Sequence, residues 1–363
     1  MGDIIHGLPA AALLKERLPN LQLTWLAEPA GIPLLEGNPA VDDTIVFPKQ
    51  KWLKQLRSVS GIPATAAEAS RFIAELKSRQ FDATLDLQGL FKSSVLGFLS
   101  GANKRFGFQG TREGAERMLT HPLNVGDYFG FETHVVDHNV RLADFASRVL
   151  LGESSAEILS PSYIYKNAKF PLPAPPVGTV KAMRHLISAP SGSMPSPMIA
   201  FIPGTTWRSK IWESHKWTEL ARLCLSRLPG PLLLLGGPAE VDMNNRIAAG
   251  FGDRIVNLTG KTEIKDLIAL FQMTDIVIGA DTGPLHLAAA VGKSKVLGIF
   301  GSTPIKRNGP YGANCATLSL NLECQPCFQK ECPLGTLACL QELSPNVAFE
   351  QVMRLVNQKP GFL

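Results

Sequence analysis

The sequence predicts an α/β protein built from two doubly wound, Rossmann-like domains. Three observations predict this class. Short apolar runs alternate with helical patterns in both halves of the chain, a stretch rich in proline and serine separates the halves, and 363 residues are enough for two separate cores. With 45% hydrophobic and 18% charged residues, the composition is that of a globular chain and excludes a disordered or fibrous one.

The first half predicts a domain over residues 1–165. Three runs have the length and composition of short strands: 21–26, 43–47 and 82–87. Residues 66–80 have helical periodicity, and so does the apolar stretch that follows Gly2 and Asp3, which reads as a strand-to-helix turn without its strand. We therefore expect this domain to lack its first strand, and the natural start to lie upstream or the sequence to be a fragment. A sheet without a central strand should leave the neighbouring strands unpaired.

The rest of the chain predicts a linker, a second domain and a last helix. Pro and Ser are dense from 153 to 199, which predicts a linker over 166–198 with no core of its own. Beyond it, five continuous apolar runs are typical of strands buried on both faces and predict a second domain over 199–340: 198–202, 232–235, 255–258, 276–279 and 296–300. Ser344 as cap and Pro345 at the first helical position predict a last helix to about 357, and we expect 341–363 to pack back towards the first domain.

The net charge and the hydropathy of the chain limit the kinds of molecule that it can bind. The net charge is +5, which favours a local acidic partner such as a phosphate or a sugar acid over a nucleic acid. No apolar run approaches the roughly 18 to 20 residues of a membrane span, and no signal peptide follows Met1. We therefore expect a cytoplasmic location.

Polar residues directly follow the first predicted strand of the second domain. Thr205, Thr206 and Lys210 lie on a strand-to-helix turn, where hydroxyls, amides and an ammonium group can hold a diphosphate. The spacing is not that of a P-loop. A polar loop with solvated cations is the alternative.

Two further strand ends carry similar signals. Glycines at 236 and 237 precede Glu240, an arrangement suited to a ribose, although Gly-Gly-Pro also forms ordinary turns. The strongest motif is GADTGPLHLAAA at 279–290, where Asp281 ends a buried strand and a helix begins with amides free to bind phosphate. A capped helix with a solvated His286 is the alternative. An aspartic protease is excluded, because that chemistry needs two such motifs on β-rich lobes.

Five segments together carry a resemblance to a known family: MGDIIHGLPA, DLQGLFKS, TTWRSKIW, GGPAE and ADTGPLHLAAA. The chain resembles the lipopolysaccharide heptosyltransferases of glycosyltransferase family 9, most closely the heptosyltransferase I type. The resemblance implies a GT-B fold with two domains facing across a cleft, an ADP-heptose donor bound by the second domain, and a Kdo-lipid A or inner-core acceptor bound by the first. It also implies inverting transfer of the heptose without a metal or other cofactor.

The resemblance assigns roles to individual residues. Asp3 matches the general base, although its carboxylate also suits a helix N-cap. Nine residues match donor contacts: Thr205, Thr206 and Lys210 at the phosphates, Glu240 at the ribose, Thr262 at the adenine, and Asp281, Thr282, Gly283 and His286 around the diphosphate and sugar.

Basic residues of the first half match the acceptor side. Lys92 and Arg112 fall at positions that the family uses for acidic acceptor sugars. Four more cations lie in KQKWLKQLR, where the alternative is a solvated helix face: Lys49, Lys51, Lys54 and Arg57. A phosphorylated lipid headgroup would suit them, which predicts peripheral contact with the inner membrane.

Cys324, Cys327, Cys332 and Cys339 form a cysteine cluster near the end of the chain. Their spacing departs from a paired zinc ribbon, so we expect structural thiols, with metal binding as the alternative. Similar cysteine-rich tails occur in family members closer to heptosyltransferase II. Cys224 and Cys315 are expected to be isolated buried thiols. Two other functions stay open: a family 9 transferase with another nucleotide sugar or acceptor, and a non-catalytic sugar-binding protein.

Overall fold

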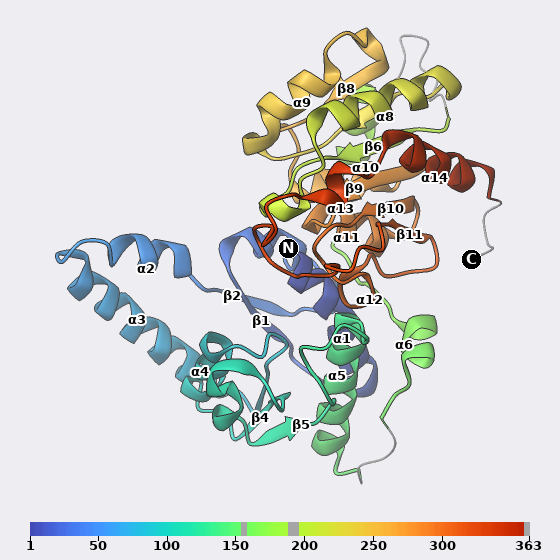
Figure 1. Ribbon diagram of the computed structural model, residues 1–363. Helices are drawn as coiled ribbons and strands as arrows, with labels where there is room; N and C mark the ends of the chain where they lie inside the picture. The colour runs from blue at the N-terminus through green and yellow to red at the C-terminus, as the bar shows by residue number, and fades with distance from the viewer. Residues whose placement is uncertain (154–157, 188–195, 359–363) are drawn as a thin grey trace. The chain divides into compact units, whose positions relative to one another are not determined.

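The structure is a computed structural model that describes residues 1–153, 158–187 and 196–358. The chain forms two compact units (Figure 1). Met1–Ile5 and Leu172–Leu363 make up the carboxy-terminal unit, and His6–Pro171 make up the amino-terminal unit. Across these described ranges, no helix is both long and apolar enough to cross a membrane.

The carboxy-terminal unit is built on a six-stranded parallel sheet with the order β11-β10-β9-β6-β7-β8. The strands are β6 (Ile199–Ile202), β7 (Leu232–Leu234), β8 (Ile255–Asn257), β9 (Ile276–Ala280), β10 (Lys295–Ile299) and β11 (Cys315–Leu318). Chain order runs outwards in both directions from the adjacent pair β6 and β9, as in a Rossmann sheet. This confirms the five strands expected in the second half and adds β11.

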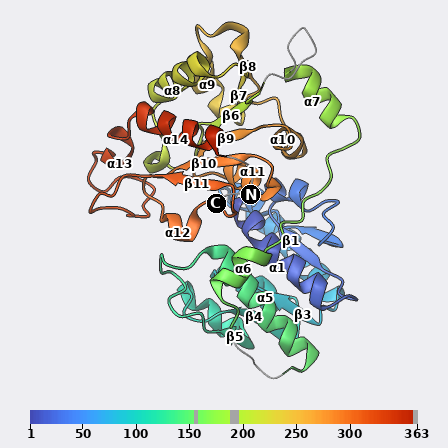
Figure 2. The ribbon, with the colours of Figure 1, turned by 90° about the vertical axis from the view of Figure 1, so that its right-hand side faces the viewer.

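Helices cover both faces of this sheet. In Figure 2, α8 (Ser214–Arg227), α9 (Val241–Ala248) and α14 (Pro345–Asn357) lie on one side of the strands, and α7 (Thr179–Ile187) and α10 (Ile264–Phe271) lie on the other. The remaining elements of the unit are α11 (Gly283–Val291), α12 (Ile305–Asn308), α13 (Ala338–Gln341) and the short 3₁₀ turns η3 (Arg208–Lys210), η4 (Pro238–Glu240) and η5 (Gly252–Arg254). Coverage on both faces explains why β6, β7 and β9 are continuous apolar runs.

The amino-terminal unit contains two separate parallel sheets. β1 (Thr24–Ala27) pairs with β2 (Asp43–Val46), and β3 (Ala83–Leu85), β4 (Lys104–Phe108) and β5 (His121–Leu123) form the other sheet. Among the described residues, β1 and β3 therefore have a hydrogen-bonded strand on one side only.

Six helices belong wholly or mainly to the amino-terminal unit: α1 (Gly2–Arg17), α2 (Lys49–Gln55), α3 (Gly61–Ser78), α4 (Phe91–Leu99), α5 (Val135–Leu151) and α6 (Pro161–Asn167), with the 3₁₀ turns η1 (Pro29–Leu34) and η2 (Arg112–Met118). The helical spacing after Gly2 is confirmed by α1. Its first turn, which contains Asp3, is counted with the carboxy-terminal unit. α2 and α3 project from the rest of their unit (Figure 1).

Two expectations need correction. The stretch 153–199 is not without packed structure, because α6 packs on α5 and α7 packs on α10 through Met183 and Ile187, whose i,i+4 spacing gives one apolar face. Residues 154–157 and 188–195 of that stretch lie outside the described residues. α14 begins at Pro345 as predicted, with Ser344 Oγ accepting from the Val347 amide, but its apolar face packs on α8 and the sheet of its own unit.

β4 and β5 went unpredicted because Lys104, Arg105, Gly107 and Pro122 interrupt their apolar patterns.

Candidate functional site

The candidate site lies where chain order reverses in the six-stranded sheet. β6 and β9 are parallel neighbours, and Ile202 of one is paired with Gly279 of the other. Two loops therefore begin side by side at the carboxyl ends of these strands: 203–210 after β6 and 281–282 after β9. Ligands of doubly wound sheets bind at such a position.

Three predicted residues meet at this point. Asp281 Oδ2 accepts from Lys210 Nζ at 2.7 Å, and Asp281 Oδ1 lies 3.0 Å from His286 Nε2. All three side chains are largely buried, with Asp281 only 7% exposed. Burial alone would raise the pKa of Asp281, but the hydrogen bonds and charges of His286 and Lys210 outweigh it and hold that pKa well below its usual range. Asp281 is therefore a carboxylate that fixes a cation and an imidazole in place.

The start of α11 faces the same loops. Thr282 is the residue before the helix, and its Oγ1 donates to Ala280 O at 3.3 Å, so it does not cap the helix amides. Pro284 follows Gly283 in the first turn. Pro284 has no N–H, and the Leu285 and His286 amides donate to Thr282 O at 3.1 and 3.3 Å. The Gly283 amide is therefore the first-turn donor left for an anion, which the positive end of the helix dipole also favours.

The first turn of α1 lies against α11. A Cβ built on Gly283 would approach Met1 Cβ to 2.7 Å, and one on Gly2 would lie 3.7 Å from His286 Cδ2. Gly283 is required here because Met1 occupies the space of a side chain. Asp3 is exposed in the turn that starts at Gly2. It is inside the helix, so the N-cap role considered for it does not apply.

Glu240 reaches back to the loop after β6. Its carboxylate accepts from the Gly237 amide at 2.6 Å. A Cβ on Gly204 would come within 2.3 Å of Glu240 Cγ, so only glycine fits at position 204. Glu240 is therefore held beside the loop that carries Thr205 and Lys210.

The remaining predicted donor residues lie on neighbouring loops. Thr205 is half-buried and Thr206 is exposed. Thr262 is half-buried in the loop after β8, which is tied to the loop after β7 by a bond from the Gly260 amide to Gly236 O at 2.8 Å. Thr205, Thr206, Lys210, Glu240, Thr262 and Asp281 thus all follow the carboxyl ends of β6 to β9.

The amino-terminal unit gathers two predicted acceptor residues around one carboxylate. Glu28 Oε1 lies 3.2 Å from Lys49 Nζ and 3.7 Å from Lys92 Nζ. Arg112 is stacked over the ring of Phe129, with its guanidinium carbon 4.3 Å from the ring centre. Lys49 and Lys92 therefore form a pair of cations that an acidic group can approach.

The other three cations of KQKWLKQLR differ in whether an acidic side chain lies beside them. Lys51 Nζ lies 2.9 Å from Glu68 Oε1 on α3. Lys54 and Arg57 are exposed at the end of α2 and beyond it. Lys51 thus has a structural partner, whereas Lys54 and Arg57 face solvent.

Sequence reasoning missed three residues that shape these sites. Trp207 lies beneath Lys210, whose Nζ is 4.3 Å from the ring centre. Buried Asn244 donates to Thr259 Oγ1 at 2.7 Å and so joins the loops after β7 and β8. Glu28 brings Lys49 and Lys92 together. The signal for Trp207 was its place between Thr206 and Lys210, while Glu28 and Asn244 gave no local signal.

Comparison with known proteins gives consistent results. Residues 69–338 match glycosyltransferase family 9 (heptosyltransferase). Lipopolysaccharide heptosyltransferase 1 of Pseudomonas aeruginosa is 28% identical over 92% of this chain and 84% of its own length.

Among solved structures, E. coli ADP-heptose lps heptosyltransferase II superposes with a TM-score of 0.73 at 19% identity, over 98% of this chain and 95% of that one. E. coli heptosyltransferase WaaC with ADP gives 0.68 at 23% identity, over 98% and 97%. These likenesses confirm the predicted fold class, a GT-B protein with two Rossmann-like domains.

Proposed function

The chain belongs to glycosyltransferase family 9, and from this premise we propose that it transfers heptose from ADP-heptose to the Kdo or inner-core region of lipopolysaccharide. The observation that carries the proposal is the meeting of Lys210, Asp281 and His286 at the sheet's switch point, beside the N-terminus of α11. A diphosphate needs these features: an ammonium charge, an N–H donor and a helix N-terminus.

In this proposal each donor residue has a task. The diphosphate lies at the N-terminus of α11, beside the Gly283 amide, with Lys210 and His286 as its side-chain partners. Asp281 does not contact the phosphates, since two anions would repel. It holds the ammonium and imidazole groups in position. Glu240 faces the ribose hydroxyls and Thr262 the adenine.

The reaction develops charge at two places. As the bond from the anomeric carbon to the diphosphate breaks, negative charge grows on the leaving ADP, where Lys210, His286 and the N-terminus of α11 stabilise it. Asp3 takes the proton of the acceptor hydroxyl that attacks the anomeric carbon from the other face, which inverts its configuration. Such a base contributes about 10²- to 10⁴-fold to the rate.

The direct test is to incubate the purified chain with ADP-heptose and Kdo-lipid A, follow release of ADP and identify the product by mass. We expect Asp3→Ala to lower kcat by about 10²- to 10⁴-fold while the affinity for ADP stays unchanged. The exposed Glu36→Ala is the matched control and should keep full activity. Absence of any transfer by the unmodified chain, with ADP bound normally, would favour a sugar-binding protein instead.

On the acceptor side, Lys49 and Lys92 bind an acidic group of the inner core. Glu28 is the carboxylate partner of both cations. A carboxylate or phosphate of the acceptor replaces or joins Glu28 as the partner of these cations, which suits bidentate recognition of a charged sugar. Arg112, supported on Phe129, is a third cation for this group.

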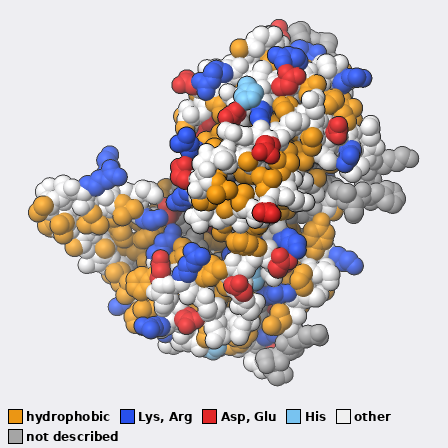
Figure 3. Space-filling model, viewed as in Figure 1, with side chains coloured by type: hydrophobic (Ala, Val, Ile, Leu, Met, Phe, Trp, Pro, Cys, Tyr) orange, Lys and Arg blue, Asp and Glu red, His pale blue; other side chains and the backbone are white. Residues whose placement is uncertain are grey.

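We assign contact with the inner face of the inner membrane to the projecting arm formed by α2 and α3. Figure 3 shows hydrophobic and basic side chains together on this arm. Four large apolar residues there are at least about half exposed: Leu53 at 50%, Leu56 at 49%, Val59 at 85% and Ile62 at 50%. Lys54 and Arg57 lie among them. Apolar residues beside cations are the composition of a surface that inserts into anionic headgroups.

A further inference from the structure

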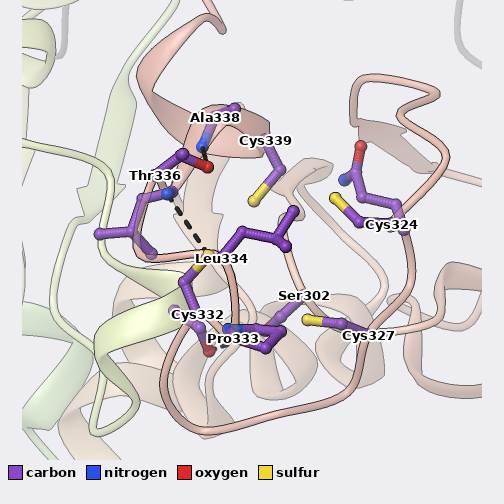
Figure 4. Close-up of a pocket in the computed structure, with 12 residues that line it drawn as sticks. Ser302, Cys324, Cys327, Cys332, Pro333, Leu334, Thr336, Ala338 and Cys339 are labelled. Atoms are coloured by element: carbon purple, nitrogen blue, oxygen red, sulfur yellow. Dashed lines mark hydrogen bonds between the residues drawn. The ribbon is translucent and has the colours of Figure 1, made fainter.

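The cysteine loop, residues 319–337 between β11 and α13, packs against the turn that carries Lys210. Figure 4 shows the thiols of the cysteine cluster around a small cavity, which Ser209 and Ser302 also line. This cavity measures about 20 Å³, so it has no room for a nucleotide or a sugar. A ligand of that size can therefore meet this loop only on its outer side.

Hydrogen bonds to two buried serines fix the backbone of the cysteine loop. The Ser209 amide donates to Lys330 O at 3.1 Å, and Ser209 Oγ donates to Gln329 O at 2.6 Å. The Phe328 amide donates to Ser302 O at 2.7 Å. Ser209 and Ser302 are each only 1% exposed, so water does not compete for these bonds. The backbone of Lys330 is thus held beside the residue that precedes Lys210.

The side chains of Lys210 and Lys330 converge on one aromatic ring. Lys210 Nζ lies 4.3 Å from the centre of the Trp207 ring, and Lys330 Nζ lies 6.0 Å from it. The ring of Phe328, in the same loop as Lys330, lies 5.7 Å from that of Trp207. An aromatic face attracts cations at these distances. Two positive charges gathered at one ring suit an anion bound beside it.

Lys330 supplies a positive charge that the candidate donor site otherwise lacks. Asp281 lies 2.7 Å from Lys210 Nζ and neutralises it, so this pair leaves little net charge for an anionic diphosphate. Lys330 is exposed, and in the part of the chain that the structure describes no acidic side chain forms an ion pair with it. Its ammonium group is therefore available to a ligand.

We propose that Lys330 is a second phosphate-binding cation of the donor site, carried by the cysteine loop and placed beside Lys210 through Ser209 and Trp207. The inference rests on the proposed function, because it adds a contact to the same nucleotide diphosphate. Asp281 fixes Lys210, whereas the flexible stem of Lys330 lets its ammonium group follow the phosphates. The cysteine loop thereby takes part in nucleotide binding through its outer side.

The test measures ADP binding to the full chain by calorimetry. Lys330→Gln should weaken ADP binding at least about tenfold, because a hydrogen bond between charged groups is lost. This difference should shrink as the salt concentration is raised, since added ions screen the attraction. Lys330→Arg keeps the charge and should recover most of the affinity. Lys330→Gln should also melt at the temperature of the unmodified chain, because the side chain is exposed.

Lys293→Gln is the matched control and has the same net charge. Lys293 is exposed just before β10, at the amino edge of the sheet and therefore opposite the strand ends that carry the donor loops. It should bind ADP as the unmodified chain does. Unchanged ADP affinity in Lys330→Gln, an equal loss in Lys293→Gln, or a loss that salt does not reduce would overturn the proposal.

The same measurements separate this inference from the proposed function. An unmodified chain that binds ADP but transfers no heptose would contradict the proposed function, while the tenfold loss in Lys330→Gln would still support the phosphate contact. An unmodified chain that binds no ADP would overturn both.

Discussion

Asp281 is the residue on which the candidate donor site depends most. It is the common partner of Lys210 and His286, and all three side chains are removed from solvent. A buried cation without a counter-ion is costly, so the carboxylate contributes to stability as well as to the proposed site. Its low pKa means that it stays charged through the range in which enzymes of this kind are assayed.

Asp281→Asn should lower the free energy of unfolding by about 3 kcal/mol near pH 7, because Lys210 stays buried without its partner. The pH dependence has a definite sign. In the folded chain the pKa of Asp281 lies below its unfolded value of 3.8. The carboxylate therefore stabilises the fold fully above about pH 3.8, and this stabilisation is lost as the pH falls towards the folded pKa. The difference between unmodified chain and variant should therefore narrow below about pH 4, which urea unfolding at several pH values measures.

The control for this prediction is Asp253→Asn, since Asp253 is exposed in η5. It should change stability by less than about 0.5 kcal/mol at any of these pH values. A difference for Asp281→Asn that stays constant down to the lowest pH would show that the asparagine acts by packing and not by charge.

Glu68 on α3 accepts hydrogen bonds from three side chains of helix α2. Glu68 Oε1 accepts from Lys51 at 2.9 Å and from Gln55 at 3.2 Å, and Oε2 accepts from Trp52 Nε1 at 3.1 Å. The hydrogen bond from Lys51, then that from Gln55, lowers the pKa of Glu68 to about 2. None of the α2 residues is fully buried, so polar contacts matter more for this helix than for most.

Glu68→Gln should free α2 from α3 and expose the connection between them to trypsin at Arg57. Cleavage there should be several-fold faster than in the unmodified chain, as read from the fragments by mass. Low pH should have the same effect, because the contribution of Glu68 is present above its unfolded pKa of 4.5 and is lost as pH falls towards about 2. An acid-stable protease such as pepsin can report this.

Glu75→Gln, also on α3, is the matched control. Glu75 lies 3.6 Å from Arg79 and has an exposed side chain, so its loss should leave α2 in place. Equal cleavage rates at Arg57 in both glutamine variants would contradict the role given to Glu68.

Elements with one clear local signal were predictable from the sequence, and elements set by distant contacts were not. α14 was predicted because Ser344 and Pro345 are strong local start signals. β9 was predicted because it is apolar and buried on both faces. β11 was missed, since Cys315, Ala316 and Thr317 are only partly buried and its position depends on pairing with β10. The packing of α14 likewise depends on tertiary contacts that no local pattern encodes.

The grouping of Lys210, Asp281 and His286 was predictable from the sequence. These residues follow strand ends, and a parallel sheet brings the carboxyl ends of its strands to one edge, so spacing along the chain was enough to group them. The ion pair between Lys210 and Asp281 was not predictable, because it depends on β6 and β9 being neighbours in the sheet, and the sequence does not give the strand order. For the same reason nothing in the sequence indicated that Glu28 would join Lys49 and Lys92.

The last prediction concerns the whole protein at a membrane. If the arm of α2 and α3 binds anionic headgroups, each cation near the surface contributes about 1 kcal/mol, so reversing two of them should weaken binding by at least about thirtyfold. The double variant Lys54→Glu with Arg57→Glu should therefore sediment poorly with vesicles containing phosphatidylglycerol. Raising the salt concentration should weaken binding of the unmodified chain in the same direction.

The matched control reverses two exposed cations of the same unit outside the arm, Lys166→Glu with Arg117→Glu, and has the same net charge as the test variant. It should bind nearly as well as the unmodified chain, because attraction falls off within a Debye length of the surface. Val59→Ser with Leu56→Ser should remove the part of the binding that resists salt, since those side chains supply the inserted apolar area. Equal loss in both charge variants would mean that net charge, and not the arm, attracts the membrane.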